Sequence, residues 1–563
     1  MKGKLFAAKA VVLIGFVSML LWTVIMILTM GYAPLTPEQA GTDWKWALPV
    51  QDNLKALFLP SPIFFVSSLI SYLISQYHDI WLYEVLKKLT KGKHLWLRNN
   101  VSTIVSALID NTVFSLLAWI ILPPEPLPLG VLSWIRRLSI SRDFSSDMRK
   151  RRLKPIYADF SGLKPPSYTG FGFTCRETGI ARARLGKLRC PHGEISTPNF
   201  IFCGTRATVK GISAEQLKQT QTDIVLANTY HLLVSPGAEL IAAAGGLHKF
   251  MRWDGPILTD SGGYQVFAMG FGSVSEEIKG RRMQGSNTIL KITEKGVRFK
   301  SYKDGRLIDL TPELSIDIQR KLGADFIVQF DECTPYHASR EYTEQSMHLS
   351  ARWGDRSLAD FMRYDNGAQA MYGVVQGGIY PDLRRASVEY LAQRPFFGTA
   401  VGGCLGKTSE EMAQVVDATM RCVPKDRPVH LLGIGLIPDI LHGVLKGIDT
   451  FDCVHPTRIA RHGHAIMPGL PGNVINLKNH RFRDDHSPLN EAFDQPFMQY
   501  TKAYIHHLFR SEELLGAQLL TLNNIFMMNR LMQDIREGLT NGRYADVYRR
   551  WTGQAFPSAL SEG

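Results

Sequence analysis

Three long apolar runs within the first 122 residues constrain this chain more than any other feature of its sequence. The first, Val11 to Met30, is uncharged and long enough to cross about 30 Å of hydrocarbon as a helix. A second run lies between Lys55 and Asp79, and a third spans Val101 to Leu122. In a soluble domain such runs would be buried helices, but no amphipathic partner helices accompany them. We therefore expect an all-α membrane segment of about three helices.

The charges around these runs favour particular sides of the membrane. The basic loop of residues 86–100 and the lysines near the N-terminus are assigned to the cytoplasm. Residues 136–154 carry eight basic and two acidic residues and favour the cytoplasm as well. Three crossings from a cytoplasmic N-terminus would instead place them on the opposite side. Either a weak crossing lies near residues 126–134, or the membrane unit is incomplete. Asp110, inside the third run, predicts a pathway residue or a position near the interface.

Composition separates the rest of the chain from this segment. The formal net charge of +13 points to phosphate backbones or anionic lipid as partners. The seven cysteines form no CxxC pair, which fits a reducing compartment and is a poor pattern for a zinc site. We expect a membrane region over residues 1–135, a basic linker over 136–166 and a globular domain over 167–555. The protein is thus predicted to be a multi-pass membrane protein with a cytoplasmic domain.

Beyond residue 170, short apolar runs repeatedly end in a polar residue or glycine. Helical stretches such as Thr311–Leu322 and Ser409–Met420 lie between them. The runs end at Asp260, Asp331, Gln376, Gly403, Gly435 and Asp452. Strands with functional groups at their carboxyl ends, alternating with helices, predict an α/β fold of the (β/α)₈ TIM-barrel type. A doubly wound sheet is the alternative, but no GxGxxG fingerprint follows a first strand.

Three of these strand ends carry carboxylates, namely Asp260, Asp331 and Asp452. Singly, each is well explained as the cap of a following helix. Together at one barrel mouth, they suggest two-carboxylate chemistry at an anomeric carbon, with one acid as nucleophile and another passing a proton.

Neighbouring residues fit a planar base on an extruded nucleotide. The glycines before Tyr264 would let backbone and a flat aromatic ring approach it closely. Gln376 and the Gly402–Gly403 backbone supply donors and acceptors for a base edge. Arg458 and Arg461 could hold phosphates, although a solvated arginine pair is an equal alternative.

The motifs TDSGGYQV, DECTPY, Gln376-Gly377, AVGG and FDCVHPTR, in this order, resemble those of the bacterial tRNA-guanine transglycosylases over about residues 168–553. The resemblance implies an irregular (β/α)₈ barrel that exchanges guanine at the first anticodon position of tRNA with a GUN anticodon for a 7-deazaguanine through a covalent intermediate. It places residues as follows: Asp452 as nucleophile, Asp260 as general acid and base, Ser261, Tyr264, Asp331, Gln376, Gly402, Gly403 and Leu432 in the base pocket, and Arg458 and Arg461 on the anticodon. The stretch Tyr500–Leu508 matches a helix used in homodimer contacts.

A second resemblance covers the front of the chain, roughly residues 5–134. Tyr72 to Phe114, with GKHLWLRNN, is similar to a central stretch of the vitamin-uptake-type transporters that import queuosine precursors. This copy is shorter than the family pattern. Two alternative functions follow: a membrane importer with a vestigial soluble domain, which would need an intact bundle, or a non-catalytic tRNA-binding paralogue, which would be expected to lose Asp260 and Asp452.

The chain departs from the transglycosylase pattern at the family's structural zinc. Where the family has Cys-x-Cys-x₂-Cys and a later histidine, this chain has Pro488–Gln499 without cysteine, and Asn523. His506 and His507 are adjacent and face different sides of a helix. We therefore expect no zinc and no other cofactor, with packing in place of the metal.

A second departure lies in the base pocket. The glutamate that grips an aminomethyl ammonium in the family is absent, and the chain reads Cys404, Leu405, Gly406 and Lys407 after the two glycines. A lysine repels an ammonium and a glycine leaves room, so queuine is the expected base. The alternative is that Glu410 or Glu411 replaces the missing acid.

Overall fold

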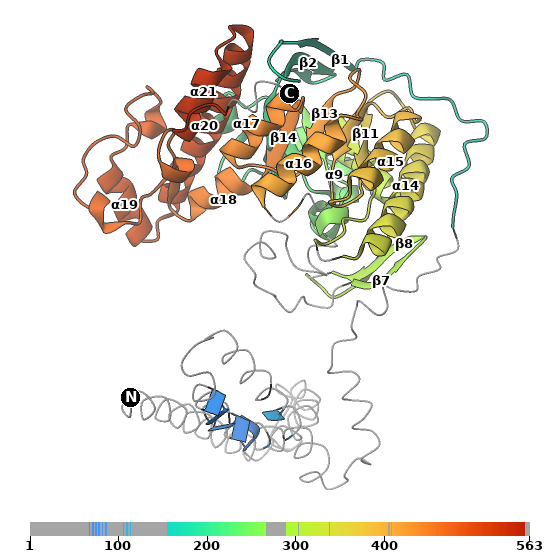
Figure 1. Cartoon of the computed structure of the whole chain (residues 1–563), viewed down its shortest axis with the longest axis horizontal. Helices are drawn as coiled ribbons and strands as arrows, with labels where there is room; N and C mark the ends of the chain where they lie inside the picture. The colour runs from blue at the N-terminus through green and yellow to red at the C-terminus, as the bar shows by residue number, and fades with distance from the viewer. Residues whose placement is uncertain are drawn as a thin grey trace, which may run out of the picture. The chain divides into compact units, whose positions relative to one another are not determined.

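The computed structural model describes residues 155–265 and 289–557 except 302, 337, 404, 405 and 407, together with scattered residues between 67 and 113 (Figure 1). The chain divides into two units, Met1–Arg151 and Arg152–Gly563, which we treat separately. The first predicted membrane run lies wholly outside the described residues, as does most of the other two.

In the first unit, the residues described between 67 and 113 are helical. The Ser71 hydroxyl lies 2.6 Å from both the backbone oxygen and Oδ1 of Asp110, so this acid has a hydrogen-bonding partner 39 positions earlier. Ser67, Ser71 and Ser75 are buried at a spacing of four residues. Within the described part of the chain, no helix combines the length and apolar character that a membrane crossing requires.

The second unit contains a closed barrel of eight parallel strands, which confirms the predicted TIM-barrel architecture. In chain order the strands are β4 (Asn199–Cys203), β5 (Val225–Ala227), β6 (Ile257–Thr259), β10 (Phe326–Val328), β11 (Ala370–Val375), β12 (Gly398–Val401), β13 (Val429–Leu431) and β14 (Thr450–Cys453). The pairing of β14 with β4 and of β6 with β10 closes the ring. Six of the strands are the apolar runs predicted from sequence, whereas β4 and β5 were not predicted.

Helices cover the outside of the barrel (Figure 1). The regular ones are α13 (Pro312–Leu322), α14 (Arg340–Arg363), α15 (Pro381–Ala392), α16 (Ser409–Met420) and α17 (Ile437–Leu445). The two helices predicted from sequence, α13 and α16, occur as expected. The Thr311 side chain caps α13 by accepting from the Leu314 amide, Pro312 opens it, and Gly323 ends it with a left-handed backbone.

Insertions make the barrel irregular. The short helices α8 (Thr229–Val234), α9 (Ala238–Ala243) and α10 (Gly246–Met251) lie between β5 and β6. A three-stranded sheet of β7 (Ile289–Thr293), β8 (Gly296–Lys300) and β9 (Leu307–Leu310) precedes α13.

The barrel has one closed and one open end. The antiparallel sheet of β1 (Gly172–Glu177), β2 (Arg184–Cys190) and β3 (Gly193–Thr197) precedes β4 directly in the chain. Its Leu188 and Ile195 are fully buried in one apolar cluster with barrel residues such as Leu258 and Val374. Since β4 begins where β3 ends, this sheet covers the amino ends of the strands. Ligand chemistry is left to their carboxyl ends.

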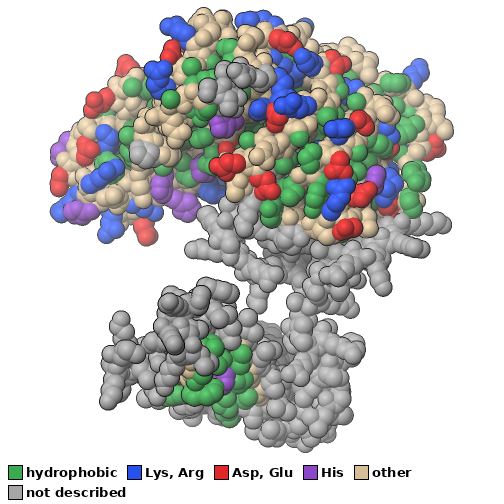
Figure 2. Space-filling model, in the orientation of Figure 1, with side chains coloured by type: hydrophobic (Ala, Val, Ile, Leu, Met, Phe, Trp, Pro, Cys, Tyr) green, Lys and Arg blue, Asp and Glu red, His purple; other side chains and the backbone are tan. Residues whose placement is uncertain are grey.

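The C-terminal part forms a helical lobe beside the barrel (Figure 1). Its elements are α18 (His455–Arg461), the β15 (His464–Ile466) and β16 (Val474–Asn476) hairpin, α19 (Lys502–Arg510), α20 (Leu514–Thr540) and α21 (Tyr544–Thr552). Figure 2 shows basic and acidic side chains interspersed on the visible face of this unit. On that face, the positive net charge is therefore spread among acids and does not form one uniform basic surface.

The loop over residues 488–499 lies against α20 through apolar contacts. The ring of Phe526 on α20 meets the rings of Phe493 and Phe497, with centroids 5.3 and 6.1 Å apart. Leu489 and Met498 are fully buried. Asn523 donates from Nδ2 to the Ile466 carbonyl at 3.3 Å. The loop has no thiolate or imidazole, and its two carboxylates, Glu491 and Asp494, are too few for the four ligands of a structural zinc.

We predict that purified, untagged protein contains no stoichiometric zinc, because this loop offers aromatic and aliphatic side chains in place of thiolates. Elemental analysis of the protein at known concentration measures this directly. A value near one zinc per chain would contradict the prediction and show that ligands come from another part of the chain.

Candidate active site

The three predicted carboxylates lie at the open end of the barrel. Asp260 follows β6, Asp331 lies three residues beyond β10, and Asp452 is the third residue of β14. Since β6 and β10 are neighbours, Asp260 and Asp331 come from adjacent strands, while β4 and β5 separate Asp260 from Asp452. Burial is the main cause that raises the pKa of Asp260, and the charge of Asp452 adds to it, so these two acids are close enough to interact. The structure thus brings the predicted acids together.

Asp452 is buried, with 8% of its surface exposed. Its Oδ1 accepts from the Gly433 amide at 2.8 Å, and its Oδ2 accepts from the Cys203 thiol at 3.6 Å. Burial, together with the negative charge of Asp452, raises the pKa of Cys203 well above its usual range. Cys203 therefore remains a thiol and can only be a weak donor.

Asp260 is held by three donors. Its Oδ2 accepts from Asn228 Nδ2 and from Gln265 Nε2, each at 2.6 Å, and its Oδ1 accepts from the Thr229 amide at 2.8 Å. Burial raises its pKa above the ordinary value, and these donors oppose that effect. If one of these donors moves away, the effect of burial is opposed less and the carboxylate takes up a proton more readily.

Asp331 shares a buried network with Ser261 and Gln376. Gln376 donates from Nε2 to Oδ2 of Asp331 at 2.6 Å, and the Ser261 hydroxyl donates to Oδ1 at 3.2 Å. Burial raises the pKa of Asp331 to about 6 despite these bonds. Oε1 of Gln376 is buried without a hydrogen-bond partner among the described residues, so it can accept from a ligand.

Glycines bring the backbone close to this network. A Cβ on Gly263 would lie 2.6 Å from the Asp331 carbonyl oxygen. One on Gly402 would lie 2.7 Å from Cγ1 of Val374 and 3.2 Å from Cδ1 of Leu432. Gly403, at φ +76°, is in the left-handed region and faces Oε1 of Gln376. Larger residues at these positions would displace the polar groups of the pocket.

Arg384 positions the Gly402 backbone and was not predicted from sequence. It is fully buried and donates from Nη1 to the Gly402 carbonyl at 2.7 Å and from Nε to the Gly378 carbonyl at 2.7 Å. Tyr264, by contrast, lies at the rim with 46% of its surface exposed. The residues predicted to bind the base therefore comprise a buried polar network and one half-exposed aromatic ring.

Basic residues gather beside Asp452. Arg458 and Arg461 lie on α18, directly after β14, and Arg461 donates to the Thr457 carbonyl at 2.7 Å. Partial burial lowers the pKa of Lys210, and the charges of Arg461, Arg206 and Arg458 lower it further. These four side chains are therefore neighbours. Arg206 and Lys210 were missed from sequence because β4, which precedes them, was not recognised as a strand.

The space beside Gly406 is occupied, which corrects one expectation. A Cβ on Gly406 would lie 3.0 Å from Oε2 of Glu411 and 2.8 Å from its Cγ. Oε1 of Glu411 lies 3.5 Å from the Tyr336 hydroxyl. The room expected at this glycine is therefore filled by a carboxylate side chain. Cys404, Leu405 and Lys407 lie outside the described residues.

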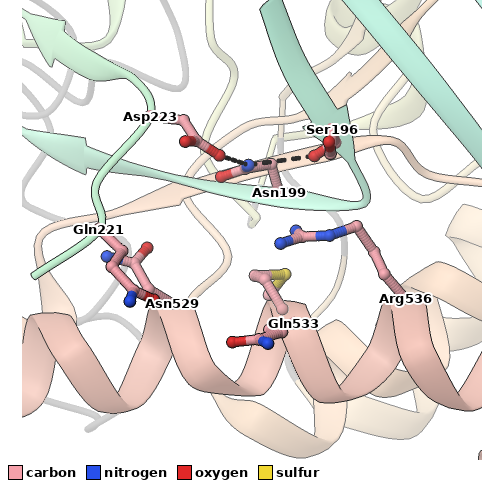
Figure 3. A pocket seen from close by; sticks show the side chains of 8 residues that line it. Ser196, Asn199, Gln221, Asp223, Asn529, Gln533 and Arg536 are labelled. Carbon is pink, nitrogen blue, oxygen red and sulfur yellow. Dashed lines mark hydrogen bonds between the residues drawn. The ribbon is translucent and has the colours of Figure 1, made fainter.

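A separate polar cavity of about 320 Å³ lies at the closed end of the barrel (Figure 3). Arg536 on α20 and Asp223 before β5 face it from opposite sides, and Asn199 donates to Asp223 at 2.7 Å. None of the three carboxylates at the open end lines it. The candidate active site is thus the strand-end cluster and not this cavity.

Comparison with known proteins agrees with the geometry. The family model described as queuine tRNA-ribosyltransferase matches residues 179–557, and that of the vitamin uptake transporters matches residues 5–142. The queuine tRNA-ribosyltransferase of Roseiflexus sp. is 45% identical over 386 residues, covering 66% of this chain and 96% of that protein. Those of Psychrobacter sp. (42% over 395 residues; 68% and 98%) and Nostoc sp. (43% over 383 residues; 68% and 96%) are similar. The chain therefore belongs to the queuine tRNA-ribosyltransferase family.

Proposed function

We propose that this protein exchanges guanine at the wobble position of tRNA with a GUN anticodon for a 7-deazaguanine, as a step of queuosine modification. The observation that carries the proposal is the meeting of Asp260, Asp331 and Asp452 at the open end of one barrel, beside a base-reading Gln376. Membership of the family supports it.

The exchange needs two displacements at the anomeric carbon. In the first, a carboxylate oxygen of Asp452 bonds to C1′ of the ribose, the C1′–N9 bond breaks, and guanine leaves with the electron pair. Asp260 supplies the proton that guanine takes up. In the second, Asp260 accepts the proton of the incoming base, the base nitrogen bonds to C1′, and the Asp452 carboxylate is released. Atoms and charges balance over the cycle.

The remaining pocket residues read the base and the RNA. Asp331 accepts from base N–H groups, while Gln376 and the Gly402–Gly403 backbone contact its other edge. Ser261 and Leu432 shape this floor. Tyr264 at the rim stacks on the ring. Arg458 and Arg461, beside Arg206 and Lys210, hold the phosphates of the anticodon strand.

The direct test of this function is guanine exchange by the purified full-length chain. A tRNA with a GUN anticodon that carries labelled guanine at its first anticodon position should lose label to solution when unlabelled base is added. The same tRNA with adenine at that position serves as the control and should lose none. Retention of label by the first tRNA would contradict the proposal.

The burial of Asp331 predicts an acid limit to the reaction. Its carboxylate form is needed to accept from base N–H groups, and burial raises its pKa to about 6. Because the group is protonated below that value, kcat/KM for tRNA should fall roughly tenfold per pH unit below pH 6. Initial rates from pH 5 to 8 measure this. Asp331→Asn should be slower and should lack this fall on the acid side, and a wild-type profile without the fall would contradict the prediction.

Queuine is the proposed incoming base, because the glutamate that binds an aminomethyl ammonium in related enzymes is missing. Loss of one charge-assisted hydrogen bond corresponds to roughly a ten- to hundredfold preference for queuine over 7-aminomethyl-7-deazaguanine. Competition of the two bases for one anticodon stem-loop measures the ratio.

The alternative is that another acid replaces the missing glutamate, and the position of Glu411 beside Gly406 makes Glu411 the candidate. If Glu411 replaces the missing acid, the wild type would use the aminomethyl base equally well or better. In that case, Glu411→Gln would lose that base selectively and keep queuine. Glu410→Gln is the matched control, because Glu410 is the neighbouring exposed acid on α16.

Two associations extend the proposal. Residues 1–135 are proposed as a multi-pass membrane region, joined by the linker 136–166 to a cytoplasmic barrel over 167–555; the match of residues 5–142 to the transporter family supports this. The segment Tyr500–Leu508 is proposed as a homodimer contact. In this segment, the rings of Tyr500 and Tyr504 are stacked with their centroids 5.7 Å apart. The two side chains are 42% and 39% exposed.

A further inference from the structure

A buried histidine lies beside the proposed nucleophile and has no role in the scheme above. His430 is the middle residue of β13 and is 1% exposed. Its Nδ1 lies 3.0 Å from the Thr450 hydroxyl on the neighbouring strand, and its Nε2 lies 3.3 Å from Oδ1 of Asp452. Nε2 makes no regular hydrogen bond to any residue that the structure describes. It is therefore a buried polar atom whose nearest carboxylate is the nucleophile.

The two contacts of His430 favour one arrangement of its ring hydrogens. Oδ1 of Asp452 is only an acceptor when ionised, so its position 3.3 Å from Nε2 favours the tautomer with a hydrogen on Nε2. Nδ1 then has a lone pair, and the Thr450 hydroxyl must donate to it. Thr450 is itself 2% exposed, which keeps water from replacing this contact. With this tautomer, Thr450 donates to Nδ1 and the Nε2 hydrogen is available to Asp452.

The two oxygens of Asp452 then differ. Oδ1 accepts from the Gly433 amide and lies 3.3 Å from Nε2 of His430, whereas Oδ2 accepts only from the Cys203 thiol among the described residues. A thiol is a weaker donor than a backbone amide, and its sulfur lies 3.6 Å from Oδ2. Oδ2 is accordingly the less stabilised oxygen and the better nucleophile.

We propose that His430 is a positioning residue that holds Oδ1 of Asp452, so that Oδ2 attacks C1′ and the carboxylate leaves readily in the second displacement. This inference rests on the proposed function. In the covalent intermediate, Oδ2 is bonded to C1′ and Oδ1 is an ester carbonyl with little charge. When the incoming base displaces it, the C1′–Oδ2 bond breaks and the electron pair returns to the carboxylate. The His430 and Gly433 donors then stabilise the charge that develops on Oδ1.

Removing the donor should affect the two half-reactions unequally. Without the donor, the Asp452 carboxylate is less well oriented for attack, but its oxygens are also less stabilised and therefore more nucleophilic. These two effects on adduct formation oppose each other. In the release step, the only effect is that the charge developing on Oδ1 of Asp452 is less stabilised. In His430→Phe, we expect release of the base-chased adduct to slow about ten- to hundredfold, the effect of one charge-assisted hydrogen bond, while adduct formation changes less. The steady-state fraction of adduct should rise.

The experiment uses the full chain in single turnovers. Adduct formation is followed by denaturing gel after mixing enzyme and tRNA, and release is followed by chasing preformed adduct with guanine. His430→Gln, whose amide can donate to Oδ1, should restore release, and Thr450→Val should show a smaller defect of the same kind. Thermal unfolding of each variant reports its stability.

Each outcome has a clear meaning. Slower release with adduct accumulation, relieved in His430→Gln, supports the inference. Unchanged rates, or equal losses in both half-reactions that His430→Gln does not relieve, would overturn it. If His430→Phe does not fold, Thr450→Val and His430→Gln decide by the same criterion. Failure of the wild type to form any adduct would refute the proposed function instead.

Discussion

Asp452→Asn should abolish the covalent adduct with tRNA and lower base exchange by roughly 10⁴-fold or more. An amide oxygen is a far poorer nucleophile than a carboxylate, and no other described acid occupies the end of β14. The substitution is nearly isosteric, so the Gly433 amide and the Cys203 thiol keep neighbours of the same size. Denaturing gels of enzyme mixed with labelled tRNA measure the adduct, and label exchange measures turnover.

The matched control is Asp382→Asn, which makes the same change at an exposed acid. Asp382 pairs with Arg340 at 2.6 Å on the surface, where solvent screens the two charges and loss of the pair should matter little for folding. Adduct yield in this variant should equal that of the wild type. An adduct that survives denaturation in Asp452→Asn would show that another residue is the nucleophile.

Asp260→Asn should slow adduct formation by about 10² to 10⁴-fold, the usual range for losing a general acid. Guanine would then leave without the proton that Asp260 supplies. Because Asp452 remains, some adduct should still accumulate over long incubation, which separates this variant from Asp452→Asn. Rates of adduct formation under single-turnover conditions measure the effect.

The fold of this variant needs its own measurement, since Asp260 accepts from Asn228, Thr229 and Gln265. An asparagine cannot accept on both sides, so some loss of stability is expected. Thermal unfolding shows whether enough protein is folded at the assay temperature. Wild-type rates of adduct formation in folded Asp260→Asn would remove this residue from the mechanism.

Most of the barrel could be predicted because six strands end in a conspicuous polar residue or glycine and alternate with helices. β4 and β5 could not. The strand β4 follows three antiparallel strands, and only the six-residue helix α7 (Ala214–Gln219) separates it from the three-residue β5. Neither shows the strand–helix period on which the prediction depends.

The site shows the same division. The acids could be found because each follows a recognisable apolar run in the sequence. Their partners His430, Cys203 and Arg384 could not, because only the pairing of distant strands or the packing of α15 brings them to the site. Gly406 shows why composition can mislead. A missing side chain predicted free space, yet Glu411 from the first turn of α16 fills it.

The aromatic attachment of the loop over residues 488–499 has a consequence for temperature. A zinc–thiolate site is sensitive to chelators and oxidants, whereas Phe493 and Phe497 against Phe526 are sensitive to neither. Contacts of this kind instead weaken as water cools, because apolar hydration becomes less unfavourable. In this protein, the loop is therefore expected to loosen in the cold and to be unaffected by metal starvation.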